Sequence, residues 1–434
     1  MIFAAASSIR SRSLAALTTA ACVAGLWLAS AATGGAQAPA RPPAPTEVRA
    51  LWVLRSSLGS PASIDALVRS AKDHGFNALL VQVRGRGDAY YTSDLEPRAA
   101  DLARQPATFD PLATVIATAH AAGLRVHAWI NVNLVSSAAE LPEAREHVVY
   151  EHPEWLMVPR EIAQDVAKID PVSPAYLGKI ARWTRGESDR VEGLYDSPIL
   201  RPAADHVDAV VTDIARRYAL DGIHLDYIRY PNDEFDYSRF AIAEFRTAMR
   251  RGLAPSVRRE VDAQDEVDLF AYPDRFPGEW KAFRRARLSD LMTRLRVDVR
   301  AARPGALLTI AAAPDAQEAA DVRLQDWPKW LDAGLIDAIC PMAYTQEPAR
   351  FAEQIAAARE IAGAHAVWAG IGAYRLTPAQ TIENIQTARR LGAAGFVLFS
   401  YDSLTGPKPP AADYLGAVSR GAFPDTKIAD SGSR

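Results

Sequence analysis

Residues 221–231 read Asp221-Gly-Ile-His-Leu-Asp-Tyr-Ile-Arg-Tyr-Pro231 and follow directly on a helical pattern. Within this stretch the polar residues His224 and Asp226 alternate with apolar neighbours. Such alternation predicts a β-strand whose two faces meet different surroundings. Asp226 stands where the apolar run ends, so its carboxylate is expected at the C-terminal end of the strand. Asp226 is therefore our first candidate for a reactive side chain.

Similar apolar runs recur from Arg49 onward and alternate with helical patterns, several of which end on glycine as αβ turns require. Eight such runs without a two-residue hairpin turn predict an α/β fold, a parallel sheet closed into a (β/α)₈ TIM barrel. An open doubly wound sheet would need a glycine-rich nucleotide loop after the first strand, and Arg55-Ser-Ser-Leu-Gly59 is not one. The predicted strands are Ala50–Leu54, Ala78–Val83, Arg125–Ile130, Gly222–Tyr227, Leu307–Ala312, Ile336–Met342, Ala366–Ile371 and Gly395–Ser400, and the predicted helices lie near Ser63–His74, Pro111–Ala122, Ala203–Ala219, Trp280–Ala302, Leu324–Ala333, Arg350–Ile361 and Pro378–Leu391.

Two connections are too long to be plain loops, one from Asn131 to about Arg201 after the third strand and one from Tyr230 to Glu279 after the fourth. Both leave the C-terminal face of the predicted barrel, where insertions shape the cleft. Their aromatic residues fit a sugar-binding cleft, because aromatic faces stack on sugar rings, but most are expected to pack the insertions onto the barrel. These residues are Trp155, Trp183, Tyr195, Phe235, Tyr237, Phe270, Tyr272 and Trp280.

The N-terminal residues 1–38 resemble a secretory signal peptide. Arg10 and Arg12 precede the apolar segment Leu14–Ala32, and Ala36-Gln-Ala38 fits a cleavage site. An uncleaved membrane anchor and a lipoprotein signal at Cys22 are the less favoured alternatives. We therefore expect an exported protein, periplasmic or extracellular, without a membrane span after cleavage. The remaining chain divides into a Pro-rich linker over 39–46, the barrel over 47–420 and a flexible tail over 421–434.

The composition and net charge of this chain argue against some classes of binding partner. Its 434 residues are 49% hydrophobic, which allows a large core, and its net charge of −3 comes without a long basic run. Neither a nucleic acid nor an anionic membrane surface is therefore an expected partner. After signal cleavage only Cys340 would remain, so an intramolecular disulfide is impossible. No cofactor is expected, and the oligomeric state is left open.

Strand alternation brings further polar residues to the expected mouth of the barrel. Burying so many of them is costly unless they bond to a ligand or to one another. For Gln82 and His127, deep in their strands, an internal network is the favoured reading. The candidates for substrate contact are Arg84, Asp88, Trp129, Asn131, Asn133, His224, Arg229 and Met342, and the candidates for catalysis are Asp226, Asp402, Asp315 and Tyr344.

Several motifs, in chain order, resemble the glycosyl hydrolase-like 10 family over about residues 47–420. This resemblance implies a (β/α)₈ barrel in an exported bacterial protein that acts on glycosidic bonds, with an oligo- or polysaccharide as partner. Some members of the family are linked to peptidoglycan strands. The motifs are Arg49-Ala-Leu-Trp-Val53, Gly75-Phe-Asn-Ala-Leu-Leu-Val-Gln-Val-Arg84, Val126-His-Ala-Trp-Ile-Asn-Val-Asn133, Gly222-Ile-His-Leu-Asp-Tyr-Ile-Arg-Tyr-Pro231 and Pro341-Met-Ala-Tyr344, with His152-Pro-Glu-Trp155 in the first insertion.

A more distant likeness is to family 18 chitinases. In that family the acetamido oxygen of the substrate attacks the anomeric carbon, an Asp and a Tyr position it, and a Glu on the same strand donates the proton. Asp226 and Tyr344 match the positioning pair, but Ile228 stands at the position of the Glu. Either the acid comes from another strand or the chitinase mechanism does not apply.

Glycoside hydrolysis normally needs one protonated and one ionised carboxyl group on opposite sides of the bond. We expect Asp226 to be the nucleophile or the stabiliser of the oxocarbenium-like centre, kept ionised by Arg84 and Arg229. The expected partner acid is Asp402 first and Asp315 second, followed by Asp88 and Glu347.

Two other classes of protein compete with a glycosidase. A metal-dependent hydrolase would use His127, His224 and Asp226, but no His-x-His pair marks the first strand, and we expect no metal. A non-catalytic glycan-binding barrel is the second alternative, because a degenerate glycosidase would retain its aromatic residues and Asn131.

Overall fold

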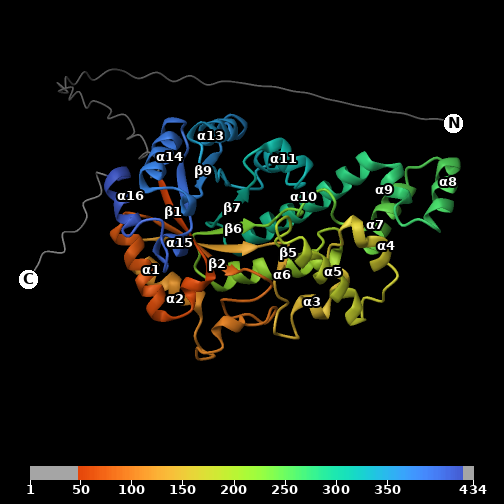
Figure 1. Ribbon diagram of the computed structural model, residues 1–434, viewed down its shortest axis with the longest axis horizontal. Helices are drawn as coiled ribbons and strands as arrows, with labels where there is room; N and C mark the ends of the chain where they lie inside the picture. Colours follow the sequence, from red (N-terminus) through yellow and green to blue (C-terminus); the bar gives the residue numbers. More distant parts are fainter. Residues whose placement is uncertain (1–46, 424–434) are drawn as a thin grey trace, which may run out of the picture. The chain divides into compact units, whose positions relative to one another are not determined.

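The computed structural model describes residues 47–423, which belong to one compact unit. Eight parallel strands form a closed barrel in the order β1-β10-β9-β8-β7-β6-β3-β2 (Figure 1). This confirms the predicted (β/α)₈ fold. The predicted signal peptide, the linker and residues 424–434 lie outside the described residues. The barrel strands are β1 (Val48–Val53), β2 (Ala78–Arg84), β3 (Arg125–Asn131), β6 (Gly222–Asp226), β7 (Leu307–Ala312), β8 (Ala338–Pro341), β9 (Ala366–Ile371) and β10 (Gly395–Phe399).

The barrel strands are buried on both faces, since one face fills the barrel and the other packs on helices. All seven residues of β2 are buried, for example. Trp52, Leu80 and Trp368 belong to the cluster of side chains inside the barrel. Their strand neighbours Leu51 and Leu79 belong to the larger cluster between strands and helices. Alternate residues of each strand therefore belong to two different cores, one inside the barrel and one between the strands and the helices. Closure of the sheet buries both sets of side chains.

Helices follow the strands around the barrel, and the turns between them form as the sequence predicts. Gly75 and Gly123, each at the end of a helix, have φ angles of 75° and 76°, a backbone conformation that glycine adopts without strain. The helices outside the insertions are α1 (Pro61–Asp73), α2 (Pro111–Ala121), α6 (Arg201–Arg217), α10 (Pro277–Ala302), α11 (Ala316–Asp321), α12 (Trp327–Asp332), α13 (Pro348–Ala362), α14 (Pro378–Arg390), α15 (Tyr401–Thr405) and α16 (Tyr414–Ala422), with 3₁₀ turns η1 (Arg55–Leu58), η2 (Ala100–Leu102) and η4 (Ala373–Arg375).

The two insertions share a hydrophobic cluster of their own with the start of α10. The first contains β4 (Leu134–Ser137), α3 (Val148–Glu151), η3 (Pro153–Trp155), α4 (Arg160–Val166), α5 (Pro174–Gly186) and β5 (Gly193–Tyr195), and β4 pairs antiparallel with β5. The second contains α7 (Arg239–Arg250), α8 (Pro255–Asp265) and α9 (Ala271–Arg275). Trp155, Tyr237 and Trp280 lie in this shared cluster (its helices are yellow to green in Figure 1). Packing is thus the main role of the aromatic residues in the insertions.

Over residues 47–423 no helix combines the length and the apolar character that a bilayer crossing requires.

Candidate active site

A cavity of about 590 Å³ lies where the barrel strands end. Its volume lies within the range of small-molecule sites, and its position is where TIM barrels carry their chemistry. Six barrel strands and the segment after β8 supply its floor and walls. The lining residues from these elements are Trp52, Gln82, Trp129, Asn131, Asp226, Ala311, Met342, Tyr344 and Phe399.

Asp226, the last residue of β6, lines this cavity and is only 7% exposed. Burial is the largest influence on its pKa and raises it to about 6, although nearby Arg229 acts in the opposite direction. Oδ1 of Asp226 accepts a hydrogen bond of 2.7 Å from the backbone N–H of Tyr227. Tyr227 has a φ of 50°, an unusual left-handed conformation for a bulky residue. Strained backbone of this kind costs about 1–3 kcal/mol and is concentrated at functional sites.

A second carboxyl group in the cavity belongs to Glu192, from the first insertion. Its Oε1 accepts a hydrogen bond of 3.0 Å from Nη2 of Arg229, and its Oε2 accepts one of 2.7 Å from the hydroxyl of Tyr195. Burial is the largest influence and raises the pKa of Glu192, but Arg229 and Tyr195 together lower it below its ordinary value. Glu192 therefore stays ionised where Asp226 tends to hold a proton.

Aromatic rings form much of the wall. The ring of Phe399 lies 5.5 Å from that of Tyr344, 6.0 Å from that of Trp52 and 6.3 Å from that of Trp129, measured between centroids. Nε1 of Trp129 donates to Oδ1 of Asn131 at 3.0 Å, which fixes the indole. Burial and the neighbouring Asp226 raise the pKa of Tyr344, so its phenol is neutral.

Six of the twelve predicted site residues line the cavity, namely Asp226, Tyr344, Trp129, Asn131, Arg229 and Met342. The other six do not line this cavity, and the hydrogen bonds or ion pairs of each are described below.

Two further cavity residues, Glu192 and Tyr227, were not predicted from the sequence. Glu192 lies near the C-terminal end of the first insertion, directly before β5, where no predicted strand end marks it. Tyr227 was not singled out because it stands next to Asp226.

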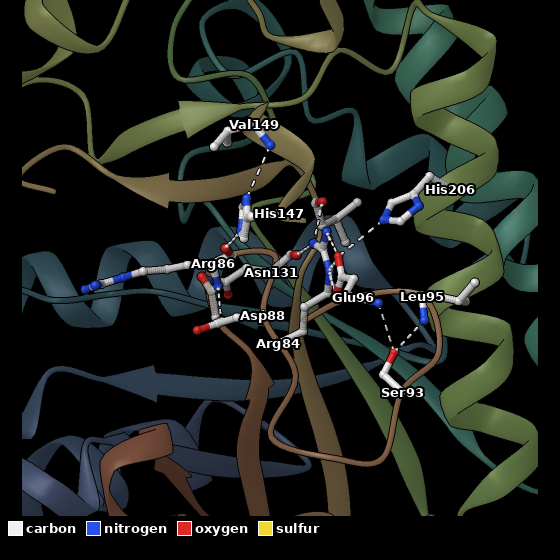
Figure 2. A network of polar contacts seen from close by, with 12 residues as sticks. Arg84, Arg86, Asp88, Ser93, Leu95, Glu96, Asn131, His147, Val149 and His206 are labelled. Atoms are coloured by element: carbon white, nitrogen blue, oxygen red, sulfur yellow. Dashed lines mark hydrogen bonds and ion pairs between the residues drawn. The ribbon is translucent and has the colours of Figure 1, made fainter. Parts of the chain in front are cut away.

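Arg84 is fully buried and does not reach the cavity, contrary to expectation. Its guanidinium pairs with Glu96 at 2.6 Å and donates to the backbone carbonyls of Asn131 and Val132 (Figure 2). Since this cation is already neutralised, it does not keep Asp226 ionised, and the raised pKa of Asp226 agrees with that.

The two carboxyl groups expected as the partner acid also lie outside the cavity lining. Asp402 accepts hydrogen bonds from the backbone N–H of Leu54 at 2.7 Å and from the hydroxyls of Ser56 and Ser57. Asp315 caps α11 by accepting from the backbone N–H of Glu318 at 2.9 Å. Both carboxylates are therefore held by hydrogen bonds within the fold, which differs from the expectation that one of them is the partner acid.

The predictions for three further residues also differ from the structure, because the larger cavity is not lined by His224, Asn133 or Asp88. His224 lies inside the barrel, where Trp52 Nε1 donates to its Nε2 at 3.0 Å and Thr309 Oγ1 lies 2.9 Å from its Nδ1. Asn133 donates to the carbonyl of Asp196 at 3.1 Å, in support of the first insertion. Asp88 accepts from Nη1 of Arg55 at 2.8 Å and lines a smaller neighbouring cavity.

Comparison with known proteins now adds to this geometry. The family model described as glycosyl hydrolase-like 10 matches residues 47–176 and 163–386, which is most of the chain. The chain belongs to the glycosyl hydrolase-like 10 family.

Two curated proteins that are similar in sequence to this glycosyl hydrolase-like 10 chain are named as glycosyl hydrolases. "Glycosyl hydrolase DigH" of Escherichia coli O6:H1 is 26% identical over 311 residues, 67% of this chain and 59% of the relative. "Glycosyl hydrolase YngK" of Bacillus subtilis is 24% identical over 203 residues, 43% of this chain and 34% of the relative. The chain thus matches less than two thirds of the length of either protein.

Solved structures show the same fold. The PgaB (BpsB) glycoside hydrolase domain from Bordetella bronchiseptica superposes with a TM-score of 0.58 at 18% identity, covering 82% of this chain and 95% of that domain. A β-galactosidase from Marinomonas ef1 superposes with a TM-score of 0.56 at 12% identity, covering 86% and 58%. These likenesses show a shared TIM-barrel fold.

Within residues 47–423, no three His, Cys, Asp or Glu side chains are grouped as metal ligands would be. Ile228, at the position of the chitinase glutamate, is fully buried in the main hydrophobic cluster. An acid for catalysis therefore has to come from elsewhere in the cavity.

Proposed function

We propose that this protein is a glycoside hydrolase that cleaves O-glycosidic bonds in a bacterial polysaccharide or peptidoglycan-type glycan. The observation that carries the proposal is the pair of carboxyl groups in one cavity. Asp226 has a raised pKa of about 6 and Glu192 a lowered one. Two carboxyl groups whose environments push their pKa values apart are the usual signature of an acid and its ionised partner.

In this proposal Asp226 carries the proton that moves to the glycosidic oxygen as the bond to the anomeric carbon breaks. Glu192 supplies the negative charge that stabilises the oxocarbenium-like centre. Water then adds to the anomeric carbon, and the proton that it loses returns to the Asp226 carboxylate. This assignment differs from the expectation of an ionised Asp226, because burial outweighs the effect of Arg229 on its pKa. The aromatic wall of Trp129, Tyr344 and Phe399 would stack against sugar rings.

Two alternatives share the same cavity. A substrate-assisted route would use Asp226 and Tyr344 to position an acetamido group of the substrate. A non-catalytic glycan-binding barrel is favoured by one observation, because both oxygens of Glu192 already accept hydrogen bonds within the protein.

The test is incubation of the mature protein with peptide-free peptidoglycan strands, chitin oligomers, and α- and β-linked glucans, with the products read by mass spectrometry. The proposal expects new reducing ends from at least one glycan, and none from the matched Asp226→Asn variant. Binding without products over a long incubation would establish the glycan-binding alternative instead. Inhibition by a thiazoline analogue of N-acetylglucosamine would select the substrate-assisted route, and absence of binding would reject it.

Export belongs to the same proposal. Polysaccharides and peptidoglycan strands of this kind lie outside the bacterial cytoplasm, which is also where the predicted signal peptide would direct the protein. Fractionation of cells that make the full chain would show the mature form in the periplasm or the medium.

A further inference from the structure

A smaller cavity of about 140 Å³ adjoins the candidate active site. The two cavities share Arg55, Arg86, Asp101 and Ser137 in their linings. Arg86 follows β2 in the loop Arg84-Gly-Arg-Gly-Asp88 and its side chain is exposed. This loop is therefore the border between the reaction cavity and a second space that a longer glycan would enter.

The backbone of this loop is held on both sides of Arg86. The carbonyl of Gly85 accepts a hydrogen bond of 2.8 Å from Nδ2 of Asn131. The carbonyl of Arg86 accepts one of 2.7 Å from Nε2 of His147, and Nδ1 of His147 accepts in turn from the backbone N–H of Val149 at 3.2 Å. The N–H of Arg86 donates to Oδ1 of Asp88 at 3.2 Å.

Gly87 completes the turn. Its φ of 67° suits glycine, and a Cβ atom built there would lie 2.8 Å from Nε2 of His147. The close contact between the loop and His147 therefore requires glycine at this position. Burial lowers the pKa of His147, so the imidazole is neutral and can donate with one nitrogen and accept with the other.

The guanidinium of Arg86 itself has no carboxylate within ion-pair distance among residues 47–423. Figure 2 shows its side chain extending away from the network that holds its backbone. The other charged groups lining the larger cavity are engaged. Arg55 is paired with Asp88 at 2.8 Å, Arg229 is paired with Glu192 at 3.0 Å, and Asp101 accepts from the hydroxyl of Tyr90 at 2.6 Å.

Acidic side chains in the smaller cavity disfavour the approach of an anion to Arg86 from that cavity. Glu140 and Glu143 line the smaller cavity alone and not the larger one. In the larger cavity, Glu192 is already paired with Arg229, and burial favours the protonated form of Asp226. A negatively charged substituent is therefore favoured on the side of Arg86 that faces the larger cavity.

We propose that Arg86 is an anion-binding residue that recognises a carboxylate carried by the glycan substrate. The inference rests on the proposed function, since it names the charge of the glycan that the cavity takes. An arginine held at a fixed backbone position suits this task, because its planar guanidinium can donate two parallel hydrogen bonds to one carboxylate. Stacking on the aromatic wall would hold the sugar ring, and Arg86 would select which sugars carry the required group.

The experiment compares two probes, peptide-free peptidoglycan strands with free carboxylates and the same strands with those groups reduced to primary alcohols. Binding is measured by calorimetry in an Asp226→Asn background, so that no cleavage disturbs it. We expect the carboxylate form to bind about five- to tenfold more tightly, as a partly exposed Arg–carboxylate contact allows. Arg86→Gln is expected to remove this preference while leaving affinity for the reduced strands unchanged, and Arg86→Lys to keep part of it.

Arg216→Gln is the matched control, because Arg216 on α6 is an exposed arginine that lines neither cavity. This variant is expected to keep the full preference. Equal affinity of the starting protein for both probes, or an equal loss for both probes in Arg86→Gln, would overturn the inference. Cleavage by the protein with intact Asp226 is scored separately, so a preference without cleavage would retain the role of Arg86 and reject hydrolysis.

Discussion

Asp226 exposes only 7% of its surface, and this burial determines how its carboxyl group titrates. Its pKa is about 6 in the folded protein against 3.8 for the ordinary group. The stability that the protonated form contributes is complete below pH 3.8 and is lost as the pH rises through about 6. Asp226→Asn removes this penalty, so at pH 7 it should increase the free energy of unfolding by on the order of 2 kcal/mol.

At pH 4 the same substitution should have almost no effect, because the native carboxyl group is then protonated as well. Urea denaturation at the two pH values measures the difference. Turnover should fall by about 10²–10⁴-fold, the usual share of a general acid. A variant with normal turnover would remove Asp226 from the mechanism.

The opposite pKa shifts of Asp226 and Glu192 predict the pH dependence of kcat/KM. A general acid with a pKa of about 6 must be protonated, so kcat/KM should fall about tenfold per pH unit above that value. Glu192 must be ionised, and its lowered pKa places the acidic limb below 4.5. Glu192→Gln should abolish that acidic limb and lower kcat, while the basic limb stays. A profile that is flat between pH 5 and 8 would contradict the assignment of the acid.

At the scale of elements, the pair of Arg84 and Glu96 ties β2 to the loop that follows it. The two side chains are 0% and 2% exposed. Removal of one partner leaves a buried charge uncompensated, so Glu96→Gln should destabilise the protein by about 3 kcal/mol or more. Asp94→Asn removes an exposed ion pair with Arg217, in which the Arg217 side chain is 38% and the Asp94 side chain 77% exposed, and should lower stability far less than Glu96→Gln does. Equal effects of the two substitutions on urea denaturation would refute this reading.

Asp402 connects α15 to Leu54 and to the 3₁₀ turn η1 by three hydrogen bonds. Asp402→Ala leaves the half-buried N–H of Leu54 without its charged acceptor, which should lower stability by about 1–3 kcal/mol. KM is expected to rise, because Leu54 and Ser56 line the cavity. The value of kcat should change less than tenfold, and a loss as large as that of Asp226→Asn would restore Asp402 as a catalytic candidate.

At the scale of the whole molecule, closure of the barrel encloses polar side chains that no ligand reaches. His127 is fully buried, and neither of its ring nitrogens has a hydrogen-bond partner. Burial lowers its pKa from 6.5 to about 4. As the pH falls below 6.5, His127 becomes protonated in the unfolded chain but stays neutral in the folded protein. The free energy of unfolding therefore decreases.

His127→Leu removes this source of acid sensitivity. The free energy of unfolding of the variant relative to the native protein should therefore increase as the pH falls from 7.5 to 4.5, by on the order of 2 kcal/mol. Urea denaturation at both pH values measures it, and the value at pH 7.5 is the control for altered packing. A difference that does not change with pH would show that His127 does not carry the effect.

Prediction from sequence succeeded where the signal is local and repeated. Period-two alternation in β6 and helix-ending glycines such as Gly75 are read over a few residues, and eight repeats of them permit only a few topologies. Trp129, Asn131 and Asp226 line the cavity as their positions predict, because residues at the ends of parallel strands meet at one face. Their roles stay predictions. Arg84 and Asp402 do not line it, because Arg84 pairs with a glutamate in the next loop and Asp402 bonds to the segment after β1.

The sequence by itself thus determined the barrel, the face that carries the site, the family and the position of Asp226, because each depends on spacing along the chain. Only the tertiary structure decided which charged side chains form ion pairs and how the pKa values of the carboxyl groups shift. It placed Glu192 from the first insertion beside Arg229 and paired Arg84 with Glu96, and among residues 47–423 it left Arg86 without a carboxylate partner. The physical reason is that pKa values and ion pairs depend on burial and on through-space distances of a few ångströms, which the order of residues does not contain.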